Sequence, residues 1–223
     1  MILTVTLNPC IDKTVFVDSV KRGSILRARA VKEIAGGKGT NVARVVKNLG
    51  RPVVALELVA GHYGRRILEL MEMDGIPYRA VWMEGISGAS RTVTTVLEES
   101  TGVQTAYVEP GPPAGAMAGE ISDKVKSEFL SLLTGARVVV LSGSAPCPEL
   151  DHLYGELGAL ARKHRPDLIL ILDSRGRALK LGLESFTPYM VKPNVAETEE
   201  LFGSRMNSEE DAVYRYRARG IEL

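Results

Sequence analysis

The run GGKGTNVARVVKNLG at residues 36–50 places three glycines and a lysine directly before an amphipathic helical pattern. Glycine lets backbone N–H groups turn toward a ligand at angles that other residues resist. The N-terminus of the following helix adds partial positive charge, and Lys38 adds a full one. A tight turn between a strand and a helix is the simpler alternative, but the glycines are denser than a turn needs. We therefore expect residues 36–41, here called the cradle, to bind an anionic or hydroxyl-rich small molecule.

Two side chains distant in the sequence could serve the same ligand. Asp12 follows the turn-forming pair Asn8-Pro9, where a carboxylate can accept hydrogen bonds from sugar hydroxyls. Arg91 begins a strand-like run, and a guanidinium suits two-point recognition of a phosphate. A turn cap for Asp12 and a solvated edge arginine for Arg91 are the simpler alternatives, and the residues alone favour them.

The segment KPNVAE at residues 192–197 is the second strong signal. Asn194 can cap the helix that follows Pro193, and Asn194 and Glu197, three residues apart, face the same side of its first turn. The alternative is a capping box without chemistry.

Short apolar runs alternate with helical patterns, which predicts an α/β fold: a mainly parallel sheet with right-handed crossovers and helices on both faces. The expected strands are residues 2–7, 53–59, 138–141 and 168–172. The expected helices are residues 40–49, 64–73, 119–133, 149–164 and, capped by Ser208 with Asp211, 208 to about 219.

Two regions break this rhythm. Residues 14–17 with 27–31, and 91–98 with 103–108, alternate or carry β-branched side chains, and Ser100-Thr101-Gly102 predicts a hairpin turn in the second pair. We expect them to form a small antiparallel sheet, with strands at about 12–31 and 90–108. It would lie as a lid over the carboxyl edge of the main sheet, where open α/β folds bind ligands.

The composition narrows the classes of function. With 45% hydrophobic and 25% charged residues and a net charge of +1, the chain lacks the basic balance of a nucleic-acid surface. Two cysteines are too few for a disulfide framework, and three scattered histidines give little support to a metal site or a triad. The N-terminus makes a poor signal peptide, and the longest apolar runs are too short to span a bilayer, so we expect a cytoplasmic protein.

Seven segments, taken in order, resemble the ribokinase-like (PfkB) carbohydrate kinases. They are TLNPCIDKT at 6–14, the cradle with its helix, SRTVTTV at 90–96, EPGPP at 109–113, LSGSAPCP at 141–148, DSRGRAL at 173–179 and VKPNVAETEELFG at 191–203. The match spans the chain and is most similar to the phosphosugar branch, which includes 1-phosphofructokinase and tagatose-6-phosphate kinase. Thr40 stands where relatives often carry an aliphatic residue.

The resemblance implies a role for each candidate sugar-site residue. Asp12 would hold the sugar, and the cradle residues Gly36, Gly37, Lys38 and Asn41 would lie along it. Arg91, with Lys38, would bind the phosphate that the substrate already carries. The expected substrate is therefore a phosphorylated ketohexose: fructose 1-phosphate, fructose 6-phosphate or tagatose 6-phosphate.

The same resemblance implies ATP and Mg²⁺ as cofactors. Lys192 would lie near the nucleotide phosphates, and Asn194 and Glu197 near the metal through waters, which suits an ion that keeps its waters. An oxidoreductase is disfavoured because Asn-Pro-Cys, and not G-x-G-x-x-G, follows the first expected strand.

Family kinases also carry a Gly-Ala-Gly-Asp segment, which supplies an anion hole and the catalytic base. The printed sequence contains no such run. We therefore expect residues 1–223 to form a truncated ribokinase-like domain that is inactive alone; a sugar-phosphate-binding remnant without catalysis is the alternative. The exposed edges of the lid could pair two subunits into a homodimer.

Overall fold

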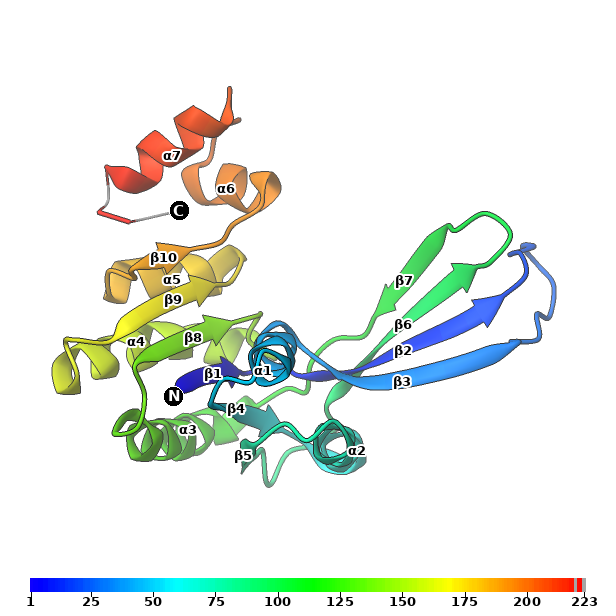
Figure 1. The fold of residues 1–223 in the computed structure, drawn as a ribbon, viewed down its shortest axis with the longest axis horizontal. Helices are drawn as coiled ribbons and strands as arrows, with labels where there is room; N and C mark the ends of the chain where they lie inside the picture. Colours follow the sequence, from blue (N-terminus) through cyan, green and yellow to red (C-terminus); the bar gives the residue numbers. More distant parts are fainter. Residues whose placement is uncertain (219, 222–223) are drawn as a thin grey trace.

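The computed structural model describes residues 1–218 and 220–221 and has an α/β architecture (Figure 1). Its main sheet has six strands in the order β10-β9-β8-β1-β4-β5, and every neighbouring pair is parallel. The strands are β1 Ile2–Thr6, β4 Val53–Val59, β5 Tyr78–Trp82, β8 Val138–Ser142, β9 Ile169–Asp173 and β10 Met190–Val191. All carboxyl ends therefore meet at one edge, called the carboxyl edge below.

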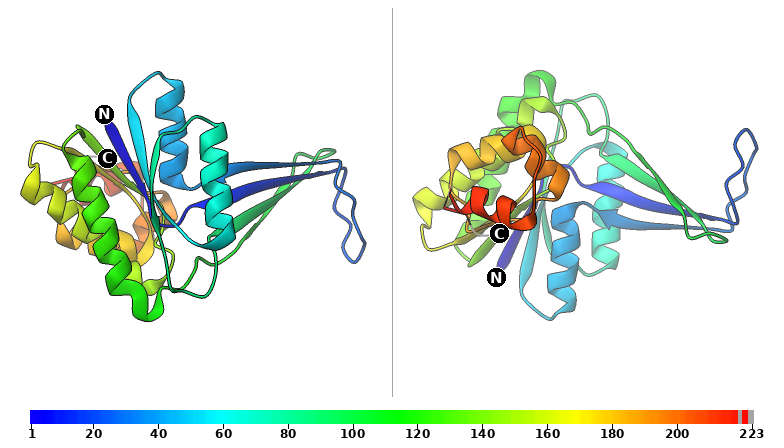
Figure 2. Two further views of the ribbon diagram at one scale, coloured as in Figure 1. Left: turned by 90° about the horizontal axis from the view of Figure 1, so that it is seen from below. Right: turned by 90° about the horizontal axis from the view of Figure 1, so that it is seen from above.

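Helices cover both faces of this sheet, as its continuous apolar strands require (Figure 2). One face carries α1 Lys38–Asn48 and α2 Gly61–Met73, and the other carries α3 Ala118–Leu133, α4 Leu153–His164 and α5 Gly176–Ser185. Side chains alternate along each strand, so Leu56 and Leu58 pack in the α3–α5 core, and Ala55 and Val59 pack in the α1–α2 core.

Shorter elements complete the chain. The single-turn helices Gly115–Met117 and Pro148–Leu150 precede α3 and α4, and α6 Val195–Phe202 and α7 Glu209–Arg217 follow β10. The expected strands and helices are confirmed, but the expected helix at 149–164 is divided, because its first residues form a separate turn. Ser208 caps α7 by accepting a hydrogen bond from Asp211 N; the expected end of this helix at Arg219 falls outside the described residues.

Four strands form a separate sheet that extends away from the main one (Figure 1). Its order is β3-β2-β6-β7, from β2 Cys10–Val17, β3 Ala30–Gly36, β6 Arg91–Glu98 and β7 Gln104–Val108. This is the expected lid, but the expectation of an antiparallel sheet is wrong: β2 and β6 pair in parallel, so the lid is mixed. Both strands leave the same edge of the main sheet and run outward, and only the returning strands β3 and β7 pair antiparallel with them.

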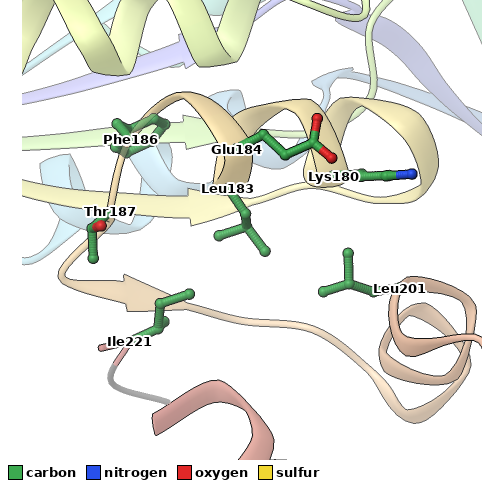
Figure 3. Close-up of a pocket in the computed structure, with 7 residues that line it drawn as sticks. All are labelled: Lys180, Leu183, Glu184, Phe186, Thr187, Leu201 and Ile221. Carbon is green, nitrogen blue, oxygen red and sulfur yellow. The ribbon is translucent and has the colours of Figure 1, made fainter. Parts of the chain in front are cut away.

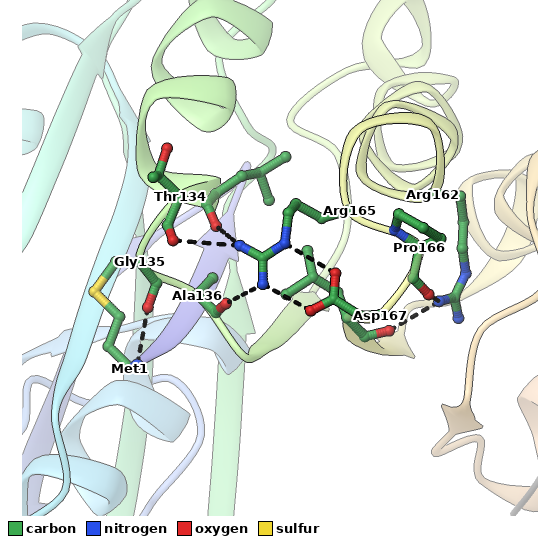
Figure 4. Close-up of polar contacts among 10 residues, drawn as sticks. Met1, Thr134, Gly135, Ala136, Arg162, Arg165, Pro166 and Asp167 are labelled. Atoms are coloured by element: carbon green, nitrogen blue, oxygen red, sulfur yellow. Dashed lines mark hydrogen bonds and ion pairs between the residues drawn. The ribbon is translucent and has the colours of Figure 1, made fainter.

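At the opposite edge of the main sheet, where its strands begin, arginine side chains form hydrogen bonds that connect neighbouring segments (Figure 4). The Arg165 guanidinium forms a two-point ion pair with Asp167, at 2.9 and 2.8 Å, and also donates to three backbone carbonyls. These belong to Leu133, Thr134 and Ala136. The Met1 ammonium group donates to Gly135 O at 2.9 Å. We call this region the amino edge. No helix of the described residues is long and apolar enough to cross a membrane.

Candidate functional site

A cavity of about 310 Å³ lies where the carboxyl edge meets the base of the lid. Its lining brings together three strands of the lid, β2, β6 and β7, the helices α1 and α6, and the loops that follow β1, β8 and β9. It includes the expected residues Asp12, Gly37, Lys38, Asn41, Arg91 and Glu197, together with Asn8, Cys10, Val93, Val108, Gly143, Ser144 and Arg175. Gly36 lies directly against the Asp12 carboxyl group. Residues from distant parts of the sequence thus converge on one pocket, as the sequence predicted.

The cradle needs its glycines for steric reasons. Gly37 has φ 118°, a conformation that side chains disfavour, and a Cβ there would lie 2.9 Å from Thr6 Cγ2. A Cβ on Gly39 would lie 3.0 Å from Val5 O and closer still to the Thr6 hydroxyl. Gly37 is also the N-cap of α1, and no side-chain hydrogen bond caps this helix. Gly37, Lys38 and Asn41 at this helix end line the cavity, and a helix N-terminus without a side-chain cap suits an anion.

Asp12 and Arg91 enter the cavity from the base of the lid. Cys10 on β2 lies opposite Arg91 on β6, and its thiol donates to Asp12 Oδ1 at 3.2 Å. Burial and the nearby Asp12 charge raise the pKa of Cys10 to about 12, so the group stays a thiol. Arg91 Nε is buried and has no hydrogen-bond partner among the described residues. A buried cationic donor without a partner is costly, and a bound anion would relieve that cost.

Lys38 is held by two carboxylates on other elements. Its Nζ lies 2.7 Å from Asp173 Oδ1 at the end of β9 and 3.8 Å from Glu197 Oε1 on α6. Arg44 on α1 donates to Asn41 Oδ1 at 2.5 Å, which orients the Asn41 amide. The cavity thus contains two cations in different states. The charge of Lys38 is balanced by two carboxylates, whereas Arg91 Nε has no partner among the described residues.

The second motif forms the capping box. Asn194 Oδ1 accepts from Glu197 N at 2.8 Å, and Glu197 Oε2 accepts from Asn194 N at 2.9 Å. Lys192 and Asn194 line a different cavity, of about 670 Å³, between β10, α6 and α7, whereas Glu197 lines the first. The structure therefore does not bring Lys192 and Asn194 into the cavity at the base of the lid, and of these three residues Glu197 alone lines it.

The fit for Mg²⁺ is limited by the same bonds. The cap occupies one carboxylate oxygen of Glu197 and the side-chain oxygen of Asn194, so only Glu197 Oε1 remains for a metal. Among the described residues no group of three His, Cys, Asp or Glu side chains could hold a metal ion. The residues fit an ion that keeps most of its waters and takes its other ligands from bound phosphates, and they do not fit a closed protein cage.

Sequence reasoning did not assign a role to Asn8, Arg175 or Glu57. Asn8 Nδ2 donates to Ser144 Oγ at 3.3 Å and to Ala145 O at 3.1 Å, which joins the end of β1 to the loop after β8. Arg175 is an exposed cation on the cavity wall. Both follow the ends of buried strands, and this position was the available signal. Glu57 lies inside β4, and its place as the one charged residue of the apolar run at 53–59 was the available signal.

A further cavity of about 390 Å³ lies beside α5 (Figure 3). Leu183 on α5, Leu201 on α6 and Ile221 line it together with Lys180, Glu184, Phe186 and Thr187. No expected site residue lines it, and the chemistry therefore concentrates at the carboxyl edge.

A parallel sheet whose carboxyl edge meets a separate β lid, with a glycine-rich cradle between them, defines a ribokinase-like α/β fold. The chain belongs to the pfkB family of carbohydrate kinases, whose family model matches residues 5–223. This is a phosphotransferase family that uses ATP.

Solved structures support the same placement. Phosphofructokinase-2 from Escherichia coli in complex with fructose 6-phosphate is 26% identical, with a TM-score of 0.85 over 99% of this chain and 71% of that one. The tetrameric inhibited form of the same enzyme matches equally well, with the same identity, coverage and TM-score. A possible 1-phosphofructokinase from Thermotoga maritima, 24% identical with a TM-score of 0.84 over 100% of this chain and 71% of that one, shares the fold.

Proposed function

We propose that this chain is the substrate-binding part of an ATP-dependent kinase of a ketohexose phosphate: fructose 1-phosphate, fructose 6-phosphate or tagatose 6-phosphate. The observation that carries the proposal is the buried Nε of Arg91, which has no hydrogen-bond partner in the described part of the chain and lies at the wall of a cavity that also holds Lys38 and the N-terminus of α1. Two cations and a helix N-terminus suit a phosphate dianion better than a neutral sugar.

The opposite side of the cavity suits the sugar. In this proposal the Asp12 carboxylate accepts hydrogen bonds from sugar hydroxyls, since within the described part of the chain its side-chain donor is the weak thiol of Cys10. The Asn41 amide group donates to another sugar oxygen, because Arg44 occupies its Oδ1. Gly36 leaves room for Asp12, which a Cβ would displace.

The proposal of a nucleotide site is based on family membership and on the cavity beside α6. We propose that Lys192 lies near the ATP phosphates and that Glu197, with Asn194 fixing its position, holds Mg²⁺ through waters. Bound Mg²⁺ would neutralise charge on the transferring phosphoryl group, and the protein contributes positioning and electrostatics. Both cysteines are free thiols, which supports a reducing cytoplasm as the setting.

Phosphoryl transfer also needs a base and an anion hole, and no residue run of the sequence resembles the family segment that supplies them. The second candidate is therefore a sugar-phosphate binder without turnover. We expect calorimetry to detect binding of one of the three ketohexose phosphates and much weaker binding of free fructose, and a coupled ADP-release assay to detect no turnover by residues 1–223.

Each result of these two assays has a separate meaning. Equal binding of fructose and its phosphates would overturn the phosphate assignment. Turnover by residues 1–223 would show that the catalytic base lies among them, and binding without turnover in a chain that carries the family segment would favour the second candidate.

We also propose a homodimer through the lid. Cross-strand register aligns Val31, Val15, Val96 and Thr105 in one row across its four strands, and Val31 is 52% exposed. Such a row on a sheet with free edges favours pairing. Sedimentation should show a dimer that Val31→Glu disrupts and Val20→Glu, in the exposed loop beyond β2, does not. Monomeric wild-type protein would refute this proposal.

A further inference from the structure

A carboxyl group is buried in the main sheet directly below the cradle. Glu57 on β4 has no exposed surface, and its neighbour in register on β1 is Thr6. The residues around it on this face are the buried α1–α2 core, which is apolar. A buried carboxyl group in such a place is expensive and is retained only where it makes specific bonds.

Glu57 joins β1 to the first turn of α1 through two hydroxyls. Its Oε1 accepts from Thr40 Oγ1 at 2.9 Å and from Thr6 Oγ1 at 3.2 Å, and the two hydroxyls lie 3.4 Å apart. All three side chains are buried. The Thr40 hydroxyl thus has a buried carboxyl group as its partner.

The cradle glycines lie directly against the side chains of Thr6 and Thr40. A Cβ on Gly37 would meet Thr6 Cγ2 at 2.9 Å and Thr40 Oγ1 at 3.1 Å, and one on Gly39 would meet the Thr6 hydroxyl. These distances leave no room for a Cβ, so the cradle backbone packs directly against both threonine side chains. Glu57 fixes both hydroxyls with one oxygen atom.

We infer that Glu57 is a positioning residue of the ligand site, which acts in its neutral form by holding Thr6 and Thr40 against the glycines of the cradle. The inference concerns the conformation of the chain and rests on the proposed function only for the identity of the ligand. Ionised Glu57 would place a negative charge beneath N–H groups that are oriented for an anion.

The charged and titratable neighbours do not supply a counter-charge in contact with Glu57. Arg44 on α1 acts on it only at a distance, because its guanidinium bonds to Asp74, Asn41 and Ala35 O. Cys10 on β2 and Tyr154 on α4 also lie within electrostatic range and stay neutral, since burial raises the pKa of both. Desolvation accordingly raises the pKa of Glu57 to about 8.

The first test needs no ligand and compares amide hydrogen exchange of residues 37–41 in four variants. Glu57→Gln keeps an oxygen acceptor, so we expect exchange within about twofold of wild type. Glu57→Leu and Thr40→Val remove the link, and we expect exchange roughly tenfold faster or more. Ser122→Ala, which removes a buried hydroxyl from α3, is the matched control and should leave the cradle unchanged.

The second test follows fructose 6-phosphate affinity with pH. For the wild type we expect affinity to fall roughly tenfold between pH 7 and pH 9.5, the size expected for one buried charge acting over ~10 Å at an effective dielectric constant of ~20. Glu57→Gln should not show this fall.

An equal fall in both proteins, or cradle exchange in Glu57→Gln as fast as in Glu57→Leu, would overturn the inference. If Glu57→Leu fails to fold, Thr40→Val, which preserves side-chain volume, decides the exchange test. If fructose 6-phosphate does not bind at any pH, the proposed substrate is wrong, and the exchange comparison still decides the role of Glu57.

Discussion

The two edges of the main sheet differ in whether their polar side chains have hydrogen-bond partners within the protein. At the amino edge, Arg165 directs its nitrogens to three carbonyls and to Asp167, all within hydrogen-bond distance (Figure 4). At the carboxyl edge, Arg91 Nε and Asn8 Oδ1 are buried without a partner among the described residues, and Lys38 has partners only across the cavity.

This difference separates stability from binding. A guanidinium with its bonds made within the protein contributes to the free energy of folding and has little left for a ligand. A guanidinium with an open bond costs folding energy and can regain it when an anion binds. Both edges use arginine, so residue type alone does not distinguish the two uses.

The largest expected effect tests the open guanidinium. Arg91→Ala should weaken sugar-phosphate binding by roughly 100-fold or more, the cost of losing a buried charge-assisted contact. Binding of the free sugar should change little. Calorimetry with a ketohexose phosphate and with fructose measures both, and Arg137→Ala, an exposed arginine at the amino edge, is the control. Equal losses for phosphate and sugar would contradict the assignment.

A substitution at the amino edge should change the stability of the protein and not its affinity for the ligand. Arg165→Ala should lower the free energy of unfolding, because three carbonyls and Asp167 lose their donor. Sugar-phosphate affinity should stay within twofold. Denaturant unfolding gives the first quantity, and Arg175→Ala, which removes an exposed arginine at the carboxyl edge, should leave it unchanged. A loss of affinity without a loss of stability in Arg165→Ala would reverse the comparison.

Glu57 gives the carboxyl edge its own dependence of stability on pH. Its pKa of about 8 in the folded protein lies above its ordinary value of 4.5, so between these values the folded state holds a proton that the unfolded state has lost. Stability contributed by this group therefore falls as pH rises. Relative to Glu57→Gln, the wild type should lose about 1.4 kcal/mol per pH unit between pH 5 and pH 7. Parallel stability profiles of the two proteins would exclude a neutral buried Glu57.

The smallest expected effect concerns Lys38, whose charge is balanced by two carboxylates. Asp173→Asn removes one of the two carboxylates that hold Lys38, so Lys38 becomes freer to meet a phosphate. Sugar-phosphate affinity should rise by roughly two- to fivefold, since the pair is partly exposed and screened. Titration at low and high salt measures this gain, with Asp167→Asn at the amino edge as control. Weaker binding would mean that Asp173 itself contacts the ligand.

Much of the architecture could be predicted because its signals are local. Continuous Val, Ile and Leu runs predicted the buried strands, and Ser100-Thr101-Gly102 predicted the β6–β7 hairpin, where Gly102 has φ 73°. β5 was missed because it is a half-exposed edge strand of mixed composition, and α5 because Gly176 and Gly182 weaken its helical pattern. The parallel pairing of β2 with β6 joins segments that are far apart in the sequence, so the local signals of the two expected strand pairs could not predict it.

The candidate site divides in the same way. Glycine density and the resemblance pointed to the cradle, Asp12 and Arg91, which share one cavity; their roles in binding remain predictions. Lys192 and Asn194 lie in another cavity, a separation that sequence spacing could not reveal. Glu57 was unpredictable because its importance depends on two hydroxyls, at positions 6 and 40, that only the fold brings to it.

The mixed pairing of the lid has a kinetic consequence. Asp12 and Arg91 lie where β2 and β6 leave the body of the protein, whereas Ile25, 93% exposed, lies between β2 and β3 at the far end. If the lid turns as one sheet about its base, the far end travels furthest, and Asp12 and Arg91, the two side chains proposed to bind the substrate, move least. A change that alters only the barrier to this motion changes the rate of ligand entry and the rate of ligand exit by the same factor, because both steps cross that barrier. Substitutions at the far end should therefore alter both rates while the dissociation constant, their ratio, stays the same.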